Sequence, residues 1–259
     1  MQSLKVIKIG GNIIDNSEKL QSFLKDFAAI DGLKILVHGG GKIASEFGKR
    51  LGIEPKMHNG RRITDAETIE LVTMVYAGLV NKGIVSKLQH LNCNALGLTG
   101  ADANTITAHK RPVNDVDFGL VGDVAIEGVN VKAISNFLSQ NYTLVLSPIT
   151  HGGNGQIFNT NADTIASIVA IAMSKIYSVT LMYCFEKKGV LADINDENSL
   201  IPLIDSTNYT HLKETGVIAD GMIPKLENAF EAIQLGVSSV RILQAEDMLQ
   251  SDAGTLIQK

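Results

Sequence analysis

A lysine inside an apolar strand pattern, with two glycines directly after it, is the first feature of this sequence that could do chemistry. Lys8 lies in the run at residues 6–9, and Gly10 and Gly11 follow. A cation at that depth needs an anion beside it, and glycines let backbone N–H groups approach a ligand that a Cβ would block. These residues predict a phosphate site at the end of the first strand. A lysine that reaches water beside an ordinary turn is the alternative.

A second glycine turn follows the next strand. Residues 33–38 form a near-continuous apolar run, typical of a strand buried on both faces, and Gly39, Gly40 and Gly41 come directly after it. The apolar spacing of residues 20–30 predicts a helix between the two strands. A β-α-β unit makes a parallel sheet, and its ligands gather at the carboxyl ends of the strands. We therefore expect both glycine turns to open on the same edge.

The triple glycine fits two nucleotide-binding motifs only in part. Residues 39–44 match the glycine spacing of dinucleotide sites. That fingerprint also requires an acidic residue closing a second strand about 20 positions later, where residues 54–62 are basic and not strand-like. In a P-loop, serine or threonine follows the lysine, whereas Ile43 follows Lys42 here. A nicotinamide oxidoreductase is thus a weak alternative that leaves Lys8 unexplained.

Further polar residues stand at expected turns and helix starts. Arg61 and Arg62 follow an Asn-Gly turn; adjacent arginines are usually solvated, but they can also clamp a carboxylate. Asn161 can cap the apolar helix that follows it, and Asp163 in its first turn can hold cationic side chains. Lys225 begins another helix, where its charge opposes the helix dipole unless an anion lies beside it.

Composition and charge exclude several classes of protein. The 259 residues are 45% hydrophobic and 19% charged, with a net charge of −4 and no basic stripe, so we expect a globular protein that binds neither nucleic acid nor membranes. Cys93 and Cys184 favour a reducing, cytoplasmic setting, and no metal-ligand spacing occurs. The first strand leaves no room for a signal peptide, and no apolar run approaches the ~18 residues of a membrane span.

The rest of the chain alternates helices with buried strands. We expect helices over 66–91 and 131–140 and strands at 94–99, 143–148, 177–183 and 239–243. Short alternating pieces over 101–130 predict a β-hairpin excursion that could act as a lid. Because the pattern restarts near residue 175, we divide the chain into 1–174 and 175–259. The fold class is α/β with a mainly parallel sheet.

Six short motifs occur in order along nearly the whole chain. They are residues 7–11 (IKIGG), 37–41 (VHGGG), 59–64 (NGRRIT), 80–82 (VNK), 158–163 (FNTNAD) and 220–225 (DGMIPK). One such motif is unspecific, but six in this order are highly specific. The sequence resembles the amino-acid kinase family, and within it the kinases that act on N-acylated glutamate in arginine biosynthesis.

The resemblance implies an αβα sandwich around a mainly parallel open sheet. An N-terminal lobe, 1–174, would bind the acyl amino acid and dimerise, and a C-terminal lobe, 175–259, would bind ATP. The implied reaction is phosphorylation of the γ-carboxylate of N-acetyl-L-glutamate, with Mg²⁺ carried on the ATP phosphates. Another amino-acid kinase, or a non-catalytic amino-acid sensor on the same fold, is a further alternative.

The resemblance also implies roles for individual residues. Lys8 and Lys225 would contact the transferring phosphoryl group and the ATP phosphates, and Asp163 would orient both lysines. The other implied contacts are phosphate binding by the N–H groups of Gly11, Gly40 and Gly41, and binding of the substrate α-carboxylate by Arg62 and Asn159.

The sequence departs from the family pattern at three places. Residues 183–191 stand where the family usually has a polar, Asp-containing turn, so the resemblance does not place the adenine contacts. Lys42 follows the triple glycine and Arg61 precedes Arg62, which adds two cations near the expected acyl pocket. They are either surface variation or a sign that the acyl group carries its own carboxylate, as in N-succinyl-L-glutamate.

The N-terminus bears on regulation. Arginine-inhibited members of the family carry an extra N-terminal helix that links dimers into a hexamer, whereas the first strand here starts almost at Met1. We therefore expect a homodimer that arginine does not inhibit.

Overall fold

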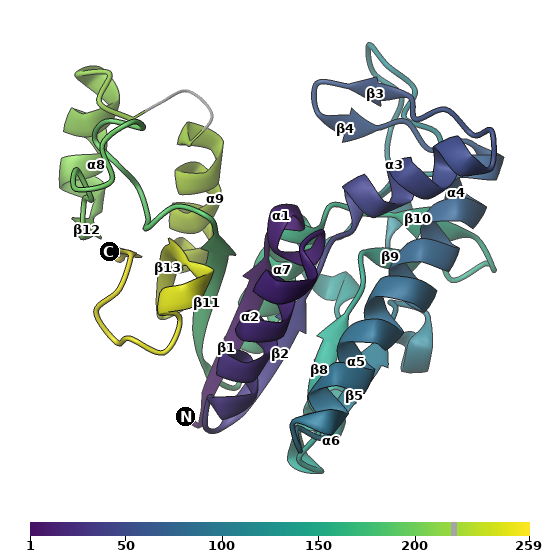
Figure 1. Ribbon diagram of the computed structural model, residues 1–259, viewed down its shortest axis with the longest axis horizontal. Coiled ribbons are helices and arrows are strands. Elements are labelled where there is room, and N and C mark those ends of the chain that lie inside the picture. The colour runs from purple at the N-terminus through teal and green to yellow at the C-terminus, as the bar shows by residue number, and fades with distance from the viewer. Residues whose placement is uncertain (219–221) are drawn as a thin grey trace.

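The computed structural model describes residues 1–218 and 222–259, and one eight-stranded sheet runs through it in the order β12-β14-β13-β11-β1-β2-β8-β5 (Figure 1). Its strands are β1 (Ser3–Ile9), β2 (Leu33–Val37), β5 (Ala95–Leu98), β8 (Thr143–Leu146), β11 (Ser178–Phe185), β12 (Leu203–Ile204), β13 (Ser239–Gln244) and β14 (Thr255–Ile257). Neighbouring strands are parallel except β13 and β14, which are antiparallel. The predicted mainly parallel sheet is confirmed.

Helices cover both faces of this sheet. They are α1 (Gly11–Ile14), α2 (Ser17–Ala29), α3 (Gly41–Arg50), α4 (Ala66–Val72), α5 (Asn81–His90), α6 (Val131–Ser139), α7 (Ala162–Met173), α8 (Ser206–Glu214) and α9 (Ile223–Gln234). Side chains of β1 divide between two cores: Leu4 and Val6 join the core under α6, α7 and α9. Ile7 and Ile9 join the core under α2, α4 and α5. The predicted αβα sandwich is confirmed.

The long helix predicted over 66–91 is a continuous run, Ala66–His90, with a π-helical segment, η1 (Thr73–Val80), between α4 and α5. By length and mean hydropathy this helix could cross a membrane, but half of its most apolar window is buried inside the fold. Core helices of globular proteins have the same properties, so the run is weak evidence for a membrane span.

Within the described residues, three small antiparallel ladders accompany the main sheet. They pair β3 (Met57–His58) with β4 (Arg61–Arg62), β6 (His109–Lys110) with β7 (Gly122–Asp123), and β9 (Ile149–His151) with β10 (Ile157–Asn159). The expectation that residues 54–62 are not strand-like is wrong, because Asn59 and Gly60 adopt positive φ angles (47° and 73°) that suit a two-residue hairpin turn.

The excursion over 101–130 is less regular than predicted. Its ladder, β6 with β7, has two residues on each strand. The remainder includes two 3-10 helices, η2 (Asp102–Asn104) and η3 (Ile126–Gly128); a further one, η4 (Ala245–Asp247), follows β13. Its proposed action as a lid stays a prediction.

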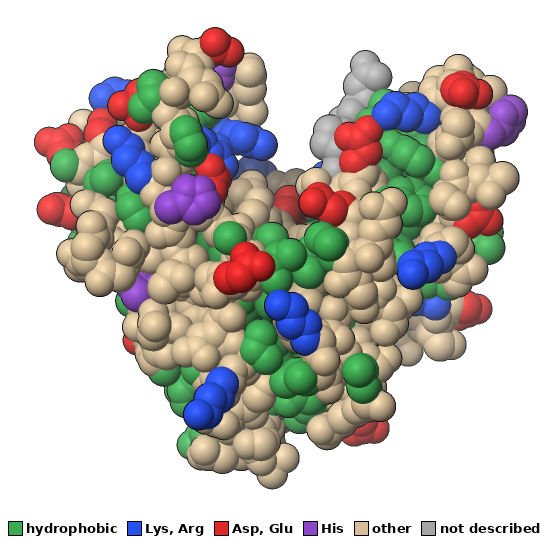
Figure 2. Space-filling model, turned by 180° about the vertical axis from the view of Figure 1, so that it is seen from behind, with side chains coloured by type: hydrophobic (Ala, Val, Ile, Leu, Met, Phe, Trp, Pro, Cys, Tyr) green, Lys and Arg blue, Asp and Glu red, His purple; other side chains and the backbone are tan. Residues whose placement is uncertain are grey.

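The carboxyl ends of β1, β2 and β8 meet at one edge of the sheet, as predicted for parallel neighbours. Helices α1 and α3 begin there, directly after the glycine N-caps Gly10 and Gly40. Seen from behind, the molecule is hollowed at this edge, between the part that carries β3 and β4 and the part that carries α8 and α9 (Figure 2). Strands from both sides of the predicted boundary at residues 174–175 belong to the same sheet, in which β1 neighbours β11. The division into two lobes stays a prediction.

Candidate active site

Lys8 and Asp163 form the centre of the candidate site. The strand alternation that turns Ile7 and Ile9 to one core turns Lys8 to the opposite face, where α7 begins. The Lys8 ammonium lies 2.8 Å from the Asp163 carboxylate, and the Lys8 side chain is 10% exposed. The lysine is therefore buried against a carboxylate, as its desolvation requires, rather than extended to water.

Asn161 fixes the position of Asp163. It is the N-cap of α7, and its Oδ1 accepts hydrogen bonds from the backbone N–H groups of Asp163 (2.8 Å) and Thr164 (3.1 Å). The cap thereby sets Asp163 in the first helical turn, beside β1. Capping by Asn161 and charge pairing by Asp163 occur together in this segment.

A second lysine approaches the same space from α9. The Lys225 ammonium lies 4.1 Å from the centre of the Phe185 ring, and the Lys8 ammonium lies 5.2 Å from that centre. Burial lowers the pKa of Lys225, the charge of Asp163 raises this pKa, and the charge of Lys8 lowers it further. The structure thus brings Lys8, Asp163 and Lys225 together. Residues 220–221 of the same motif lie outside the described residues.

The second glycine turn requires glycine at position 40. Gly40 has a φ of +152°, and a Cβ there would lie 3.0 Å from the Tyr76 ring. Gly11 and Gly41 are the first residues of α1 and α3. A helix leaves the N–H groups of its first turn without intrahelical partners, so these groups are available to an anion at the edge where Lys8 lies.

A buried hydrogen-bond chain supports this turn from below. His38 is fully buried, with Nδ1 2.8 Å from the Gly39 carbonyl oxygen and Nε2 3.0 Å from the Asn81 amide nitrogen. Because a carbonyl accepts and an amide N–H donates, Nδ1 carries the proton and Nε2 accepts. Lys82 donates to Asn81 Oδ1 at 3.1 Å. Burial lowers the pKa of His38 to about 4, so the imidazole is neutral. The motif at 80–82 thus helps to orient the glycine turn.

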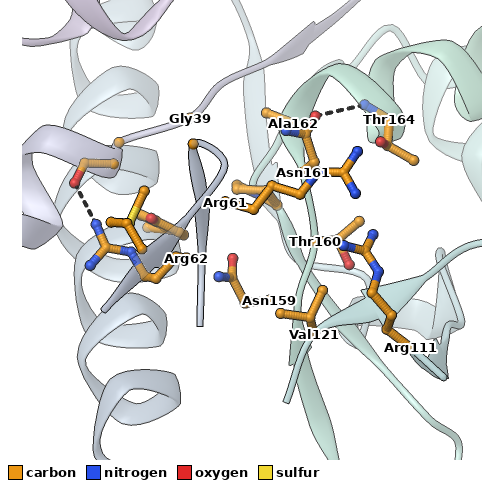
Figure 3. Close-up of a pocket in the computed structure, with 16 residues that line it drawn as sticks. Gly39, Arg61, Arg62, Arg111, Val121, Asn159, Thr160, Asn161, Ala162 and Thr164 are labelled. Atoms are coloured by element: carbon orange, nitrogen blue, oxygen red, sulfur yellow. Dashed lines mark hydrogen bonds between the residues drawn. The ribbon is translucent and has the colours of Figure 1, made fainter. Parts of the chain in front are cut away.

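A cavity of about 240 Å³ lies beside the triple glycine (Figure 3). Arg62 and Asn159 line it together with the glycine turn, and their binding of a substrate α-carboxylate stays a prediction. Arg62 is 9% exposed, and one of its terminal nitrogens donates to the Gly41 carbonyl and the Ser45 hydroxyl at 2.9 and 2.8 Å. Asn159 donates to the Thr64 hydroxyl at 3.0 Å. Protein contacts therefore hold both side chains in place without a ligand.

The two cations that suggested a charged acyl group lie apart. Arg61 lines the cavity (Figure 3). Lys42 is not among the lining residues: its ammonium contacts Asn12 Oδ1 and lies 3.7 Å from the Asp15 carboxylate. The first turn of α3 thus directs the Lys42 side chain towards α1, and a role of Lys42 in acyl-group specificity stays a prediction.

Arg111 lines the cavity and was not found by sequence reasoning. It follows β6, and its guanidinium donates to both carboxylate oxygens of Asp123 in β7 at 2.6 to 3.2 Å. Its guanidinium carbon also lies 5.4 Å from the centre of the Phe118 ring. The pairing of β6 with β7 brings Arg111 and Asp123 together, and no local motif signals that pairing.

At this edge of the sheet, two lysines lie beside the N-termini of α1, α3 and α7. A cavity lined by arginines adjoins them. At the carboxyl ends of a parallel sheet, these groups suit transfer of a phosphoryl group to a small anionic substrate, which defines a class of small-molecule kinase. The model of the amino acid kinase family matches residues 3–244. The chain belongs to the amino acid kinase family.

Curated relatives match nearly the whole chain. Acetylglutamate kinase of Cytophaga hutchinsonii is 58% identical over 251 residues, which cover 96% of this chain and 94% of the relative. Acetylglutamate kinase of Bacteroides fragilis is 54% identical over 258 residues, 100% of this chain and 98% of the relative.

Solved structures share the fold. The protein smu.665 from Streptococcus mutans UA159 superposes with a TM-score of 0.78 at 28% identity and covers 98% of each chain. Carbamate kinase from Giardia lamblia bound to AMP-PNP has a TM-score of 0.69 at 17% identity, covering 100% of this chain and 99% of that one. At such low identity the second comparison shows the fold alone.

Proposed function

We propose that this protein transfers the γ-phosphoryl group of ATP to the γ-carboxylate of N-acetyl-L-glutamate, giving N-acetyl-L-glutamyl 5-phosphate and ADP in arginine biosynthesis. The family and the relatives named acetylglutamate kinase support this function. The observation that carries it is the pair of Lys8 and Asp163, with Lys225 beside it, next to a cavity lined by arginines.

The proposed chemistry depends on alignment rather than on proton transfer. A γ-carboxylate with a pKa of about 4.3 is ionised at neutral pH, so it attacks the γ-phosphorus without a general base. Arg62 and Asn159 hold the substrate α-carboxylate. Lys8 and the N–H groups of the glycine turns neutralise the charge that spreads over the phosphoryl oxygens, and Asp163 keeps the Lys8 ammonium in place.

In this proposal ATP binds to the C-terminal lobe, where Lys225 contacts its phosphates. The donors at the edge are ammonium and N–H groups, and the carboxylate of Asp163 is already paired with Lys8. Ammonium and N–H groups are suited to bind phosphate oxygens. They are not suited to bind a metal ion, which prefers several oxygen ligands. In this proposal Mg²⁺ would be carried on the ATP phosphates, where it would neutralise part of their charge, while Lys8 and Lys225 contact the phosphate oxygens.

The acetyl compound is the favoured acceptor. The curated relatives are named for it, whereas N-succinyl-L-glutamate was suggested by two extra cations. One of these cations, Lys42, contacts Asn12 and Asp15 instead of the cavity.

We further propose a cytoplasmic homodimer. Met74 and Leu79 lie on the π-helical segment η1 and are 58% and 52% exposed. Ile69 and Ile157 line a groove beside Met74. Large apolar side chains exposed on one segment favour burial against a second copy. The buried free thiols of the two cysteines suit a reducing compartment.

A coupled assay of ADP release tests the reaction. We expect substrate-dependent turnover with N-acetyl-L-glutamate, a lower kcat/KM with N-succinyl-L-glutamate, and background rates with free glutamate and aspartate. A higher kcat/KM for the succinyl compound would reject the acetyl assignment. Binding of N-acetyl-L-glutamate without any ADP release would instead support a non-catalytic sensor.

A further inference from the structure

The Phe185 ring lies beside both lysines of the candidate site, and the proposed phosphoryl transfer assigns it no role. Phe185 is the last residue of β11, within the segment 183–191 that departs from the family pattern. Its ring stacks on Tyr183, with centres 6.2 Å apart and planes at 11°. A Cβ built on Gly10 would lie 3.5 Å from the Phe185 ring. The ring is therefore fixed between its own strand and the first glycine turn.

Two positive charges lie against this ring. The centre of the ring is 4.1 Å from the Lys225 ammonium and 5.2 Å from the Lys8 ammonium. Asp163 supplies one negative charge, 2.8 Å from Lys8. The face of an aromatic ring attracts cations, most strongly where water is excluded. The ring thus attracts the Lys225 ammonium electrostatically, as the Asp163 carboxylate attracts the Lys8 ammonium.

We propose that Phe185 is a positioning residue for phosphoryl transfer, whose ring holds the ammonium groups of Lys8 and Lys225 at one end of the site before the nucleotide binds. The inference rests on the proposed function. An aliphatic side chain would fill similar space but lacks the negative ring face. Because that face repels anions, phosphate oxygens reach the two ammonium groups from the side away from the ring.

Fluorinated analogues of phenylalanine at position 185 separate the charge of the ring from its shape. One, two or three ring fluorines withdraw electron density from the face with little change in size. We expect kcat/KM for ATP to fall stepwise, by about tenfold across the series. Loss of the cation–π attraction between the ring and the two ammonium groups corresponds to a change of about this size. A ring that merely fills space gives a flat series and overturns the proposal.

The matched control is Phe23, which stacks on Phe27 in the core on the opposite face of the sheet. The same analogues at position 23 should leave kcat/KM unchanged. Two ordinary variants extend the test: Phe185→Tyr keeps the ring and should stay within about threefold of the native enzyme, whereas Phe185→Leu should lose at least about tenfold in kcat/KM for ATP.

Calorimetric binding of AMP-PNP with Mg²⁺ measures the effect of the ring without turnover. We expect Kd to weaken in the same order as kcat/KM. If the native enzyme turns over N-acetyl-L-glutamate but both series are flat, the role of Phe185 is rejected and the proposed function stands. If the native protein releases no ADP with N-acetyl-L-glutamate but Kd still follows fluorination, the proposed function fails and the role of the ring in positioning the lysines stands.

Discussion

Two lysines of the central strands are buried, and their partners distinguish their roles. Lys8 meets a carboxylate at the start of a helix, 2.8 Å away. Lys34 in β2 is 5% exposed and donates instead to the carbonyl oxygens of Ala28 and Ile30, at 2.9 and 2.5 Å. Carbonyls at the end of a helix satisfy a structural cation, because the helix leaves them without partners. Burial alone therefore does not distinguish the lysine that we propose to be catalytic. What distinguishes Lys8 is its position at the carboxyl ends of the parallel strands, beside Asp163.

Removing the Lys8 ammonium tests its role at the reacting centre. We expect Lys8→Ala to lower kcat by about 10² to 10³, because one preorganised charge donor to the phosphoryl oxygens is lost. ADP release measures the effect. Lys5→Ala is the control, since Lys5 lies on the same strand and its Nζ reaches the Asp31 carbonyl at 3.5 Å. Near-normal turnover of a folded Lys8→Ala protein would remove Lys8 from the mechanism.

At the scale of elements, helix α5 and the turn after β2 act as one unit. The contacts from Lys82 to Asn81 and from Asn81 to His38 end on the Gly39 carbonyl. Asn81 also donates to the Val145 carbonyl in β8 at 3.0 Å. The orientation of the glycine N–H groups is thus set by helix α5, whose side chains do not line the candidate cavity; Tyr76, in the adjoining segment η1, does.

The buried imidazole makes stability depend on pH. The pKa of His38 is about 4 in the folded protein against 6.5 ordinarily, so its contribution is fully present above pH 6.5 and is lost as pH falls towards 4. Between pH 7 and pH 5 we expect the native protein to lose about 2 kcal/mol of unfolding free energy from this group. Urea denaturation of the native protein and of the His38→Gln variant, at pH 7 and at pH 5, measures this loss of unfolding free energy.

The His38→Gln protein lacks this titration, so the difference in unfolding free energy between the two proteins should shrink by that amount from pH 7 to pH 5. Equal pH slopes in the two proteins would show that His38 does not titrate as inferred.

The position of a site residue could be predicted from the sequence where a single segment determines it. The alternation of β1 turns Lys8 inward, and the Asn161 cap sets Asp163 in the first turn of α7. Contacts that depend on the pairing of distant segments could not be predicted from the sequence. Arg111 reaches the cavity through the register of β6 with β7, and Phe185 meets Lys8 through the register of β1 with β11. Neither register leaves a local pattern in the sequence.

At the scale of the whole molecule, we expect the proposed homodimer to depend on the exposed apolar side chains of η1. Met74→Glu combined with Leu79→Glu should yield monomers, because charges would be buried in the apolar contact. Light scattering after size exclusion measures the mass. Leu235→Glu, at a residue 46% exposed at the end of α9, should leave the dimer intact. A native protein that is already monomeric, or a double variant that stays dimeric, would contradict this prediction.

The central position of β1 has a consequence for synthesis of the chain. Leu4 pairs with Leu33 on one side, whereas Ser3 pairs with Ser178 on the other. The first edge can therefore form early during translation, but the second has no partner until β11 has left the ribosome. Throughout that interval an apolar strand edge is open to mispairing. The strand that carries Lys8 is thus among the first made and among the last completed.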